Sequence, residues 1–390
     1  MDATIHRFFS PCPRGLEGVL ASELEGLGAQ APEATQGGVA FRGEFPLCYQ
    51  VNLESRIASR VLWQIAGGRY GSEEDIYRAA YGLPWTNWFD AGRTVMVKVS
   101  ARKCPLRSLD FLTLRIKDAL CDAFRRATGS RPSVETHAPD VRVYAFLDAE
   151  RFTLYLDTSG PALFQRGLRQ AGTEAPLREN LAAGILKLAG WSPGIPLLDP
   201  MCGGGTILLE AAQMALNIAP GMDRGFGFEK LNNFCARTWD TIRGASLARQ
   251  LPKTPQPIYG SDLSGNTLAA ARTNLEAAGL SQALRLNQAN VLEISAPADT
   301  GIIVTNPPYG VRLGEQQELA EFYPRLGDVL KKKFSGWRVY LLTADMRLPG
   351  LMRLAPSRRI PLFNGPLECR LFEFKMVEGS ARRKKPEPDA

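Results

Sequence analysis

The sequence predicts an α/β protein in which a parallel-sheet domain follows an α+β region. From about residue 175 onward, apolar strand candidates alternate with glycine turns and helices, a pattern typical of a parallel sheet with crossover helices. In residues 1 to about 160, short strand-like runs are mixed with amphipathic helices. The chain has 390 residues, 45% of them hydrophobic, which is enough for two or three domains with separate cores.

The N-terminal region contains two clear helices and two clear strands. Residues 16–27 are amphipathic and end at Gly28, and residues 110–128 predict a second helix that Gly129 stops. The strand candidates alternate polar and apolar side chains, and they lie at 94–100 (TVMVKVS) and 151–157 (RFTLYLD).

The C-terminal region contains five apolar strand candidates, at 196–198, 258–260, 283–288, 302–305 and 339–343. Between them, Ser264 can cap a helix that runs to Ala278, with Gly279 as its stop. The region closes with a hairpin over 362–375, in which Asn364-Gly365 forms the turn.

Composition favours a cytoplasmic protein with a polyanionic partner. The sequence has no apolar run of about 18 residues, which a membrane helix requires, and its first residues lack the apolar core of a secretory signal. A formal net charge of +7 is compatible with nucleic acid. The seven cysteines are scattered without a C-x-x-C pair, so we expect free thiols, and with only two histidines we expect no metal site.

A glycine-rich turn between residues 197 and 206 (LLDPMCGGGT) indicates a ligand crevice. A short strand ends in Asp199, and the glycines let the backbone approach a ligand before an apolar helix begins. A tight structural turn is the alternative. A P-loop is disfavoured because no Gly-Lys-Ser/Thr is present and Asp199 would repel a pyrophosphate. An acid here suits a cofactor with a positive amino or sulfonium group.

Polar side chains also follow the next two strands. The carboxylate of Asp262 can accept both hydroxyl protons of a ribose, although it could instead cap the following helix. The amide of Asn290 offers a donor and an acceptor to an adenine edge, although singly it is unremarkable.

The fourth strand ends in Asn306-Pro307-Pro308-Tyr309. Two adjacent prolines fix the backbone and remove two N–H donors, which leaves a rigid set of carbonyl acceptors. The side-chain oxygen of Asn306 and the carbonyl of Pro307 could hold both hydrogens of an exocyclic amine, while Tyr309 stacks on the extruded base. The alternative is a Pro-Pro turn that merely ends the strand.

This four-residue motif resembles the Asp/Asn-Pro-Pro-Tyr/Phe signature of class I methyltransferases that act on exocyclic amines. Nearly the whole chain resembles the THUMP-containing members, in particular the bacterial 23S rRNA guanine-N2 methyltransferases. Residues 9–29 resemble their opening ferredoxin-like module, and residues from about 45 to 158 resemble the THUMP domain. Residues 157–169 (DTSG to RGLR) resemble the family's linker, and residues 175–181 (APLRENL) resemble a helix that closes over the cofactor.

The resemblance implies a Rossmann-like class I methyltransferase domain preceded by an α+β ferredoxin-like/THUMP RNA-binding region. Its expected segments are a ferredoxin-like module (1–60), a THUMP domain (61–160), a methyltransferase domain (161–377) and a disordered basic tail (378–390). The implied cofactor is S-adenosylmethionine and the implied partner is RNA, 23S rRNA first.

By position, the expected cofactor residues are Asp199, Met201, Cys202, Gly203, Gly205, Thr206, Asp262, Leu263, Asn290, Val291 and Asn306. The target amine is expected at Asn306, Pro307, Pro308 and Tyr309. Asn290 departs from the Asp that the family usually has there. The basic residues of 102–107, together with Lys117, Arg125 and Arg126, could contact phosphates, although an exposed helix face explains the last three equally well.

Four other functions stay open at this point: a tRNA guanine-N2 methyltransferase, a nucleic-acid adenine-N6 methyltransferase, a cytosine-C5 enzyme and a non-catalytic RNA-binding assembly factor. The adenine-N6 enzyme would use the same motif, but a DNA enzyme needs a target-recognition domain, which the sequence does not suggest. The cytosine-C5 enzyme needs a cysteine beside the target, and 306–310 contains none. The sequence does not indicate an oligomeric state.

Overall fold

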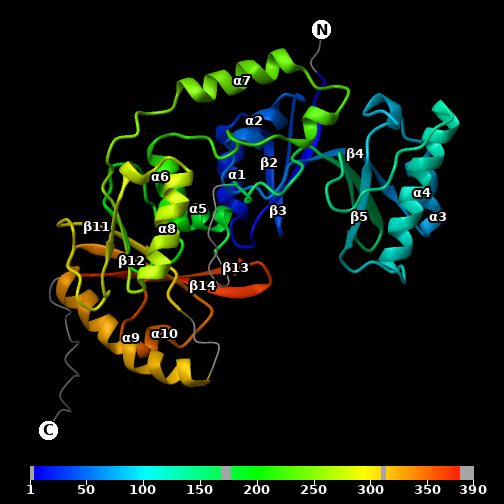
Figure 1. Ribbon diagram of the computed structural model, residues 1–390. Coiled ribbons are helices and arrows are strands. Elements are labelled where there is room, and N and C mark those ends of the chain that lie inside the picture. The colour runs from blue at the N-terminus through cyan, green and yellow to red at the C-terminus, as the bar shows by residue number, and fades with distance from the viewer. Residues whose placement is uncertain (1–3, 168–176, 309–312, 378–390) are drawn as a thin grey trace. The chain divides into compact units, whose positions relative to one another are not determined.

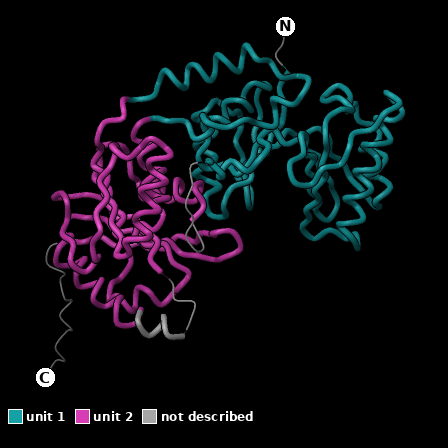
Figure 2. Tube along the Cα trace, in the orientation of Figure 1, with its two compact units in different colours: residues 1–167, 217–251 teal, residues 168–216, 252–390 magenta. Residues whose placement is uncertain are grey.

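The computed structural model describes residues 4–167, 177–308 and 313–377, with only the backbone for 313–318. The chain divides into two compact units (Figure 2): unit 1 contains residues 1–167 and 217–251, and unit 2 contains residues 168–216 and 252–390. Three sequence-based expectations lie outside the described residues: Tyr309 of the motif, residues 168–176 of the linker and closing helix, and the tail 378–390.

Unit 1 is built on a single seven-stranded sheet with the order β2-β3-β1-β4-β7-β6-β5 (Figure 1). Its strands are β1 (His6–Pro11), β2 (Gln30–Thr35), β3 (Gly38–Gly43), β4 (Leu62–Arg69), β5 (Val95–Ala101), β6 (Val141–Leu147) and β7 (Arg151–Asp157). Its helices are α1 (Glu17–Gly26), α2 (Leu47–Glu54), α3 (Glu73–Tyr81), α4 (Leu109–Thr128) and α7 (Ala236–Ala248), with short 3-10 turns at Trp85–Asn87 and Gly227–Lys230. Strand β4 pairs with β1 on one side and β7 on the other, so the expected ferredoxin-like and THUMP segments share one sheet.

Local sequence signals define the ends of the main helices of unit 1. The hydroxyl of Ser108 accepts a hydrogen bond from the backbone N–H of Phe111 at 3.1 Å and caps α4. Gly129 follows the helix in the left-handed conformation (φ 76°), which confirms the predicted stop. Ser72 and Asp75 form a capping box at the start of α3.

Residues 217–251 pack into the core of unit 1 although they follow the start of the expected methyltransferase domain in sequence. The ring of Tyr49 on α2 lies 4.4 Å, centroid to centroid, from that of Phe228, and the Phe228 ring lies 5.2 Å from that of Trp239 on α7. All three side chains are buried. Burial of these large rings, rather than chain order, assigns the segment to unit 1.

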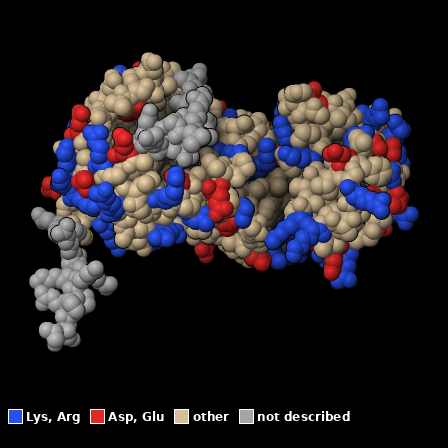
Figure 3. All heavy atoms as spheres, turned by 90° about the horizontal axis from the view of Figure 1, so that it is seen from below, with Lys and Arg blue, Asp and Glu red and all other residues tan. Residues whose placement is uncertain are grey.

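The charge of unit 1 is unevenly distributed along the chain. Between Lys98 and Arg131, nine Lys and Arg residues accompany only three Asp residues, so this stretch holds +6 of the net +7 of the whole chain. The stretch covers the end of β5, the following loop and α4. Figure 3 shows blue side chains gathered over the part of unit 1 at the right, where Figure 1 draws β5 and α4.

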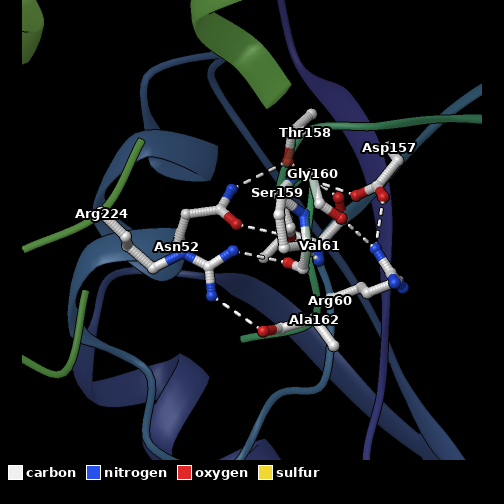
Figure 4. A network of polar contacts seen from close by, with 10 residues as sticks. Asn52, Arg60, Val61, Asp157, Thr158, Ser159, Gly160, Ala162 and Arg224 are labelled. Atoms are coloured by element: carbon white, nitrogen blue, oxygen red, sulfur yellow. Dashed lines mark hydrogen bonds and ion pairs between the residues drawn. The ribbon is translucent and has the colours of Figure 1, made fainter. Parts of the chain in front are cut away.

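A buried polar network joins the two halves of the sheet of unit 1 (Figure 4). The amide of Asn52 on α2 donates to the Thr158 hydroxyl at 2.9 Å and accepts from the Ser159 hydroxyl at 2.5 Å. The guanidinium of Arg60 lies 2.6 Å from the carboxylate of Asp157 and also donates to a backbone carbonyl at Gly160. Each of these polar groups has a partner. The segment that resembles the family's linker therefore starts, at residues 157–160, with residues that hydrogen bonds hold in place at the end of β7.

Unit 2 contains a second seven-stranded sheet with the order β10-β9-β8-β11-β12-β14-β13. Its strands are β8 (Leu197–Asp199), β9 (Ile258–Asp262), β10 (Arg285–Gln288), β11 (Gly301–Thr305), β12 (Trp337–Thr343), β13 (Arg358–Asn364) and β14 (Leu367–Lys375). Its helices are α5 (Glu179–Leu188), α6 (Thr206–Ala215), α8 (Gly265–Ala277), α9 (Leu313–Lys333) and α10 (Leu348–Leu351), with a 3-10 turn at Ser281–Ala283. The first five strands are parallel and β14 is antiparallel to β12. This order confirms the predicted Rossmann-like fold.

The predicted strands of unit 2 are confirmed, with ends that differ by a few residues. Strand β10 begins at Arg285 rather than at residue 283, because the 3-10 turn occupies Ser281–Ala283. Strand β11 is buried at all five positions, as a central parallel strand covered on both faces requires. Among the described residues, no helix combines the length and apolar character needed to cross a bilayer.

Candidate cofactor and target-amine site

The expected site residues of unit 2 lie at the carboxyl ends of its parallel strands. Strands β8 and β11 are neighbours, but the chain leaves β8 toward β9 and leaves β11 toward β12, so the strand order reverses between them. Such a reversal opens a crevice in which doubly wound sheets bind ligands. Asp199 ends β8 on one side of this crevice, and Asn306 follows β11 on the other.

The glycine turn after β8 has the backbone geometry that only glycine adopts readily. Gly203 and Gly205 have φ of 54° and 80°, and Gly205 is the residue that precedes α6. The N–H of Cys202 donates to the carbonyl of Ser261 at 2.9 Å, which ties the turn to the end of β9. The turn therefore exposes backbone toward the crevice, and Thr206 begins the helix beyond it.

Asp262 connects the glycine turn to the start of α8. One of its carboxylate oxygens accepts from the N–H of Gly203 at 3.0 Å, and the other accepts from the N–H of Ser264 at 3.0 Å. A carboxylate has about four acceptor positions, so each oxygen keeps a lone pair for a further donor. The Ser264 hydroxyl accepts from the N–H of Thr267, which confirms Ser264 as the cap of α8.

Burial makes Asp199 an unusual carboxyl group. Its side chain is only 1% exposed, and burial raises its pKa to about 7, with the negative charge of Asp262 adding to the increase. The Thr305 hydroxyl and the N–H of Met201, 3.3 Å from the carboxylate, offset only part of that rise. Near neutral pH, Asp199 is therefore poised to ionise when a positive group arrives.

Cys202 is not a nucleophile of this site. Its side chain is buried, and burial, followed by the charges of Asp199 and Asp262, raises the pKa of its thiol well above the ordinary range. Only a thiolate attacks a base carbon efficiently. Cys202 is one of seven free cysteines.

The residues after β10 are arranged differently from those after β8 and β9. The side-chain oxygen of Asn290 accepts from the N–H of Leu292 at 3.0 Å, and its amide donates to Glu293 at 3.3 Å. Each half of the Asn290 amide keeps one further hydrogen-bonding position. Val291 packs into the core with its side chain 6% exposed, whereas Leu263 after β9 is 69% exposed. Leu263 is thus an apolar side chain beside the carboxylate of Asp262.

The motif after β11 is anchored by a residue that the sequence did not suggest. The hydroxyl of Tyr323 on α9 donates to the carbonyl of Pro308 at 2.7 Å, and the Tyr323 side chain is fully buried. Asn306 is half-buried and Pro307 is buried. The carbonyls of Pro307 and Pro308 therefore differ. That of Pro308 already accepts a hydrogen bond from Tyr323 within the fold.

Two further residues hold the turn and also went unpredicted. The amide of Asn274 on α8 donates to the carbonyl of Gly204 at 3.0 Å. Gly260 on β9 lies under α6, where an added Cβ would come within 2.3 Å of a methyl group of Leu208. A side chain at this position would force the side chains of Leu208 and Leu286 to move.

A sequence signal existed for both polar residues. Asn274 falls on the helix face that also carries Ala271 and Leu275, and Tyr323 continues the buried stripe of Leu326 and Leu330. A polar atom on an apolar stripe needs a partner inside the protein.

Three family models match successive parts of the chain. Residues 7–62 match the profile of the RlmL ferredoxin-like domain, residues 70–157 that of the THUMP domain, and residues 166–373 that of the RMKL-like methyltransferase domain. The last match runs through residues 217–251, which pack in unit 1.

Similar proteins include two curated relatives and a solved structure. The chain is 36% identical over 398 residues to the ribosomal RNA large subunit methyltransferase K/L of Aeromonas hydrophila, a match that covers 97% of this chain and 55% of that protein. It is 35% identical over 376 residues to a putative RNA methyltransferase of Synechocystis, covering 96% of this chain and 98% of that one. The crystal structure of a putative methyltransferase complexed with SAH has a TM-score of 0.87 and 27% identity, covering 97% of this chain and all of that one. The chain spans about half the length of the K/L proteins it matches.

Proposed function

Because the chain belongs to the RMKL-like methyltransferase family and carries a THUMP domain, we propose that it methylates the exocyclic N2 amine of a guanine in 23S rRNA, in the cytoplasm. The family depends on S-adenosylmethionine, which is therefore the methyl donor of this chain. The guanine, its N2 atom and the 23S rRNA are parts of the proposal. The observation that carries it is the rigid Asn306-Pro307-Pro308 segment at the reversal of strand order, opposite Asp199.

The residues of the crevice suit the parts of this donor. We assign the carboxylate of Asp199 to the amino group of the methionine portion, since a buried acid gains most from a positive partner. The remaining lone pairs of Asp262 are assigned to the ribose hydroxyls. Asn290 and the apolar side chain of Leu263 are assigned to the adenine, along with the backbone of Val291.

The acceptor oxygens after β11 orient the target amine. The side-chain oxygen of Asn306 and the carbonyl of Pro307 each hold one N–H, which turns the nitrogen lone pair out of the ring plane. The hydrogen bond from Tyr323 keeps the Pro308 peptide fixed, so the acceptors do not need to reorganise.

When bound, S-adenosylmethionine supplies an electrophilic methyl group: the new N–C bond forms, the C–S electron pair stays on sulfur, and the nitrogen then loses a proton. No strong base is required of the protein, because the amine becomes acidic only as it is methylated. Asn306 and Pro307 already hold the N–H groups from which that proton departs.

The alternatives differ in how well this site serves them. A cytosine-C5 enzyme is disfavoured because burial keeps the Cys202 thiol protonated. Adenine N6 presents an amine to the same two oxygens, so guanine N2 is preferred through the family resemblance. A tRNA substrate would leave the chemistry unchanged. The assembly factor is disfavoured because the glycine turn, Asp199 and Asp262 form a coherent polar site.

The proposal is tested by the product and by Asn306→Ala. Purified protein, labelled S-adenosylmethionine and rRNA should give N2-methylguanine on digestion and mass analysis. Asn306→Ala should lower the rate by about 10²–10³, the cost of losing one positioned hydrogen-bonding group, while cofactor affinity stays close to wild type.

Three results would contradict the proposal in different ways. N6-methyladenine as the product would keep the mechanism and overturn the base, whereas a methyl group on a ring carbon would overturn both. An active Asn306→Ala variant would remove the amine from the assigned position. Circular dichroism and cofactor titration of the variant exclude misfolding as the cause of a lost rate.

A further inference from the structure

The surface between β5 and α4 combines unpaired cations with exposed apolar side chains. The loop carries Arg102, Lys103 and Arg107, and the first turns of α4 carry Phe111 and Leu114. We call these five residues the β5–α4 patch. Its three cations are exposed, and none forms an ion pair or a hydrogen bond through its side chain with any described residue.

The patch is held on a well-anchored backbone. The N–H of Arg102 donates to the carbonyl of Leu147 at 2.8 Å, and the Tyr70 hydroxyl lies 3.2 Å from the sulfur of Cys104. The Ser108 cap then fixes the first turn of α4. The cationic side chains therefore have no partners, while hydrogen bonds hold the backbone that carries them. A held backbone lowers the entropic cost of binding a ligand.

The apolar members point away from the core. Phe111 is 51% exposed and Leu114 is 53% exposed, one helical turn apart on the outer face of α4, whereas Leu112 and Ile116 are fully buried. The exposed phenyl ring of Phe111 has no aromatic or cation–π contact with any described residue, and it follows Arg107 by one helical turn in the sequence. Aromatic rings beside cations are the surface on which unpaired bases stack while phosphates are neutralised.

The neighbouring cations serve the fold instead. The Arg115 guanidinium lies 4.1 Å from the Tyr77 ring and 2.5 Å from the Glu74 carboxylate, and that of Arg126 lies 4.3 Å from the Tyr81 ring. These stacks pack α3 against α4. Of the five cations of the stretch that have no side-chain partner among the described residues, three lie in the loop before α4, and Lys98 and Arg131 are the other two.

We propose that the β5–α4 patch binds a single-stranded segment of the RNA substrate, with Phe111 stacking on an unpaired base and the three cations contacting consecutive phosphates. This inference rests on the proposed function, because RNA is the substrate there, and it adds the surface and the strandedness. A duplex keeps its bases stacked inside, so it offers phosphates to the patch but no base to Phe111.

The test measures binding of the full-length chain to a labelled single-stranded RNA and to the same strand annealed to its complement, by fluorescence anisotropy at several salt concentrations. Phe111→Ala should weaken single-strand binding roughly 5- to 150-fold, the range for loss of a base–aromatic stack, and should leave duplex binding unchanged. The matched control is Phe146→Ala on β6. Phe146 is 41% exposed, but it alternates with the buried Ala145 and Leu147 and so faces the other side of the sheet.

The cations are tested by the triple variant Arg102→Ala/Lys103→Ala/Arg107→Ala. It should lower the slope of log affinity against log salt by about 2, since each phosphate contact on a single strand contributes about 0.7. A second triple variant, Arg7→Ala/Arg42→Ala/Arg78→Ala, removes the same charge from exposed positions elsewhere in unit 1 and should change the slope little.

The inference is overturned if each patch variant binds like its matched control, or if Phe111→Ala weakens duplex and single strand equally. Methyl transfer by the same preparations separates this failure from that of the proposed function. Wild-type protein that methylates RNA, with patch variants that bind normally, would retain the function and reject the patch. If the wild-type protein methylates no RNA but the patch variants lose single-strand binding, the patch is retained and the proposed function is rejected.

Discussion

Asp199 illustrates how the environment of one residue determines what it can bind. The side chain ends a central strand, so the sheet buries it, and burial raises its pKa to about 7. The sequence indicated an acid at a strand end beside glycines. It could not indicate the pKa, because the shift depends on the residues that the fold brings around the carboxyl group, including Thr305 and Asp262.

The raised pKa predicts that cofactor affinity depends on pH. Only the carboxylate pairs with a cation, so below about pH 7 binding must release a proton from Asp199. Affinity for S-adenosylmethionine should fall about tenfold per pH unit below that value. Calorimetric titration between about pH 5.5 and 7.5 measures it, and Asp199→Asn should bind weakly with no such dependence.

The same pKa shift makes the stability of the ligand-free protein depend on pH. Asp199 binds its proton more tightly when folded, so its contribution to stability is complete below the unfolded value of 3.8 and is lost as the pH rises through about 7. For the binding experiment, an affinity for S-adenosylmethionine that does not change with pH would show that Asp199 does not face the positive group of the cofactor.

At the scale of elements, the periodicity of apolar residues and the turn residues predicted most of the strands and helices of unit 2. The parallel strands, the glycine turn and the Ser264 cap are written in neighbouring residues, because each depends on local backbone preferences. The hydrogen bonds of Tyr323 to Pro308 and of Asn274 to Gly204 join residues far apart in sequence. Their partners follow from how α8 and α9 pack on the sheet, which no single segment encodes.

Tyr323→Phe tests whether α9 positions the target-amine loop. The variant keeps the buried ring and removes the hydroxyl that donates to Pro308. We expect the methyl-transfer rate to fall while KM for the cofactor stays unchanged, with a stability loss of about 0.5–1.5 kcal/mol, typical for one hydrogen bond. Single-turnover kinetics and thermal unfolding measure the two effects.

The matched control is Tyr340→Phe, which removes another buried tyrosine hydroxyl from unit 2, on β12 beside Glu373. It should cost comparable stability without slowing transfer. Equal rates for wild type and Tyr323→Phe would leave the hydrogen bond to Pro308 with a structural function only.

For the whole molecule, sequence patterns and packing divide the chain differently. The family resemblance implied one methyltransferase domain from residue 161 to 377, and the repeating strand and helix pattern a parallel-sheet region from about residue 175, yet residues 217–251 pack in unit 1. Aromatic contacts between Tyr49 and Phe228 decide this, and they connect positions almost 180 residues apart. Periodicity within a segment cannot reveal which core will receive its apolar face.

This division predicts how the chain can be dissected. Removing only residues 1–160 would strip Tyr49 and its neighbours from Phe228 and Trp239, so that variant should expose apolar surface and aggregate. Removing residues 1–167 and also replacing 217–251 by a flexible Gly/Ser linker should leave a soluble unit 2 that binds S-adenosylmethionine. Its RNA affinity should be mostly lost, because the concentrated positive charge lies in unit 1.

Size-exclusion chromatography, thermal unfolding and calorimetric titration distinguish the two deletions. A monomeric, cooperatively unfolding protein lacking only residues 1–160 would mean that 217–251 do not need the core of unit 1. If unit 2 alone folded but bound no cofactor, the site would require residues that the present assignment omits. RNA binding by isolated unit 2 at full strength would contradict the division of labour, since unit 2 lacks the basic stretch between Lys98 and Arg131.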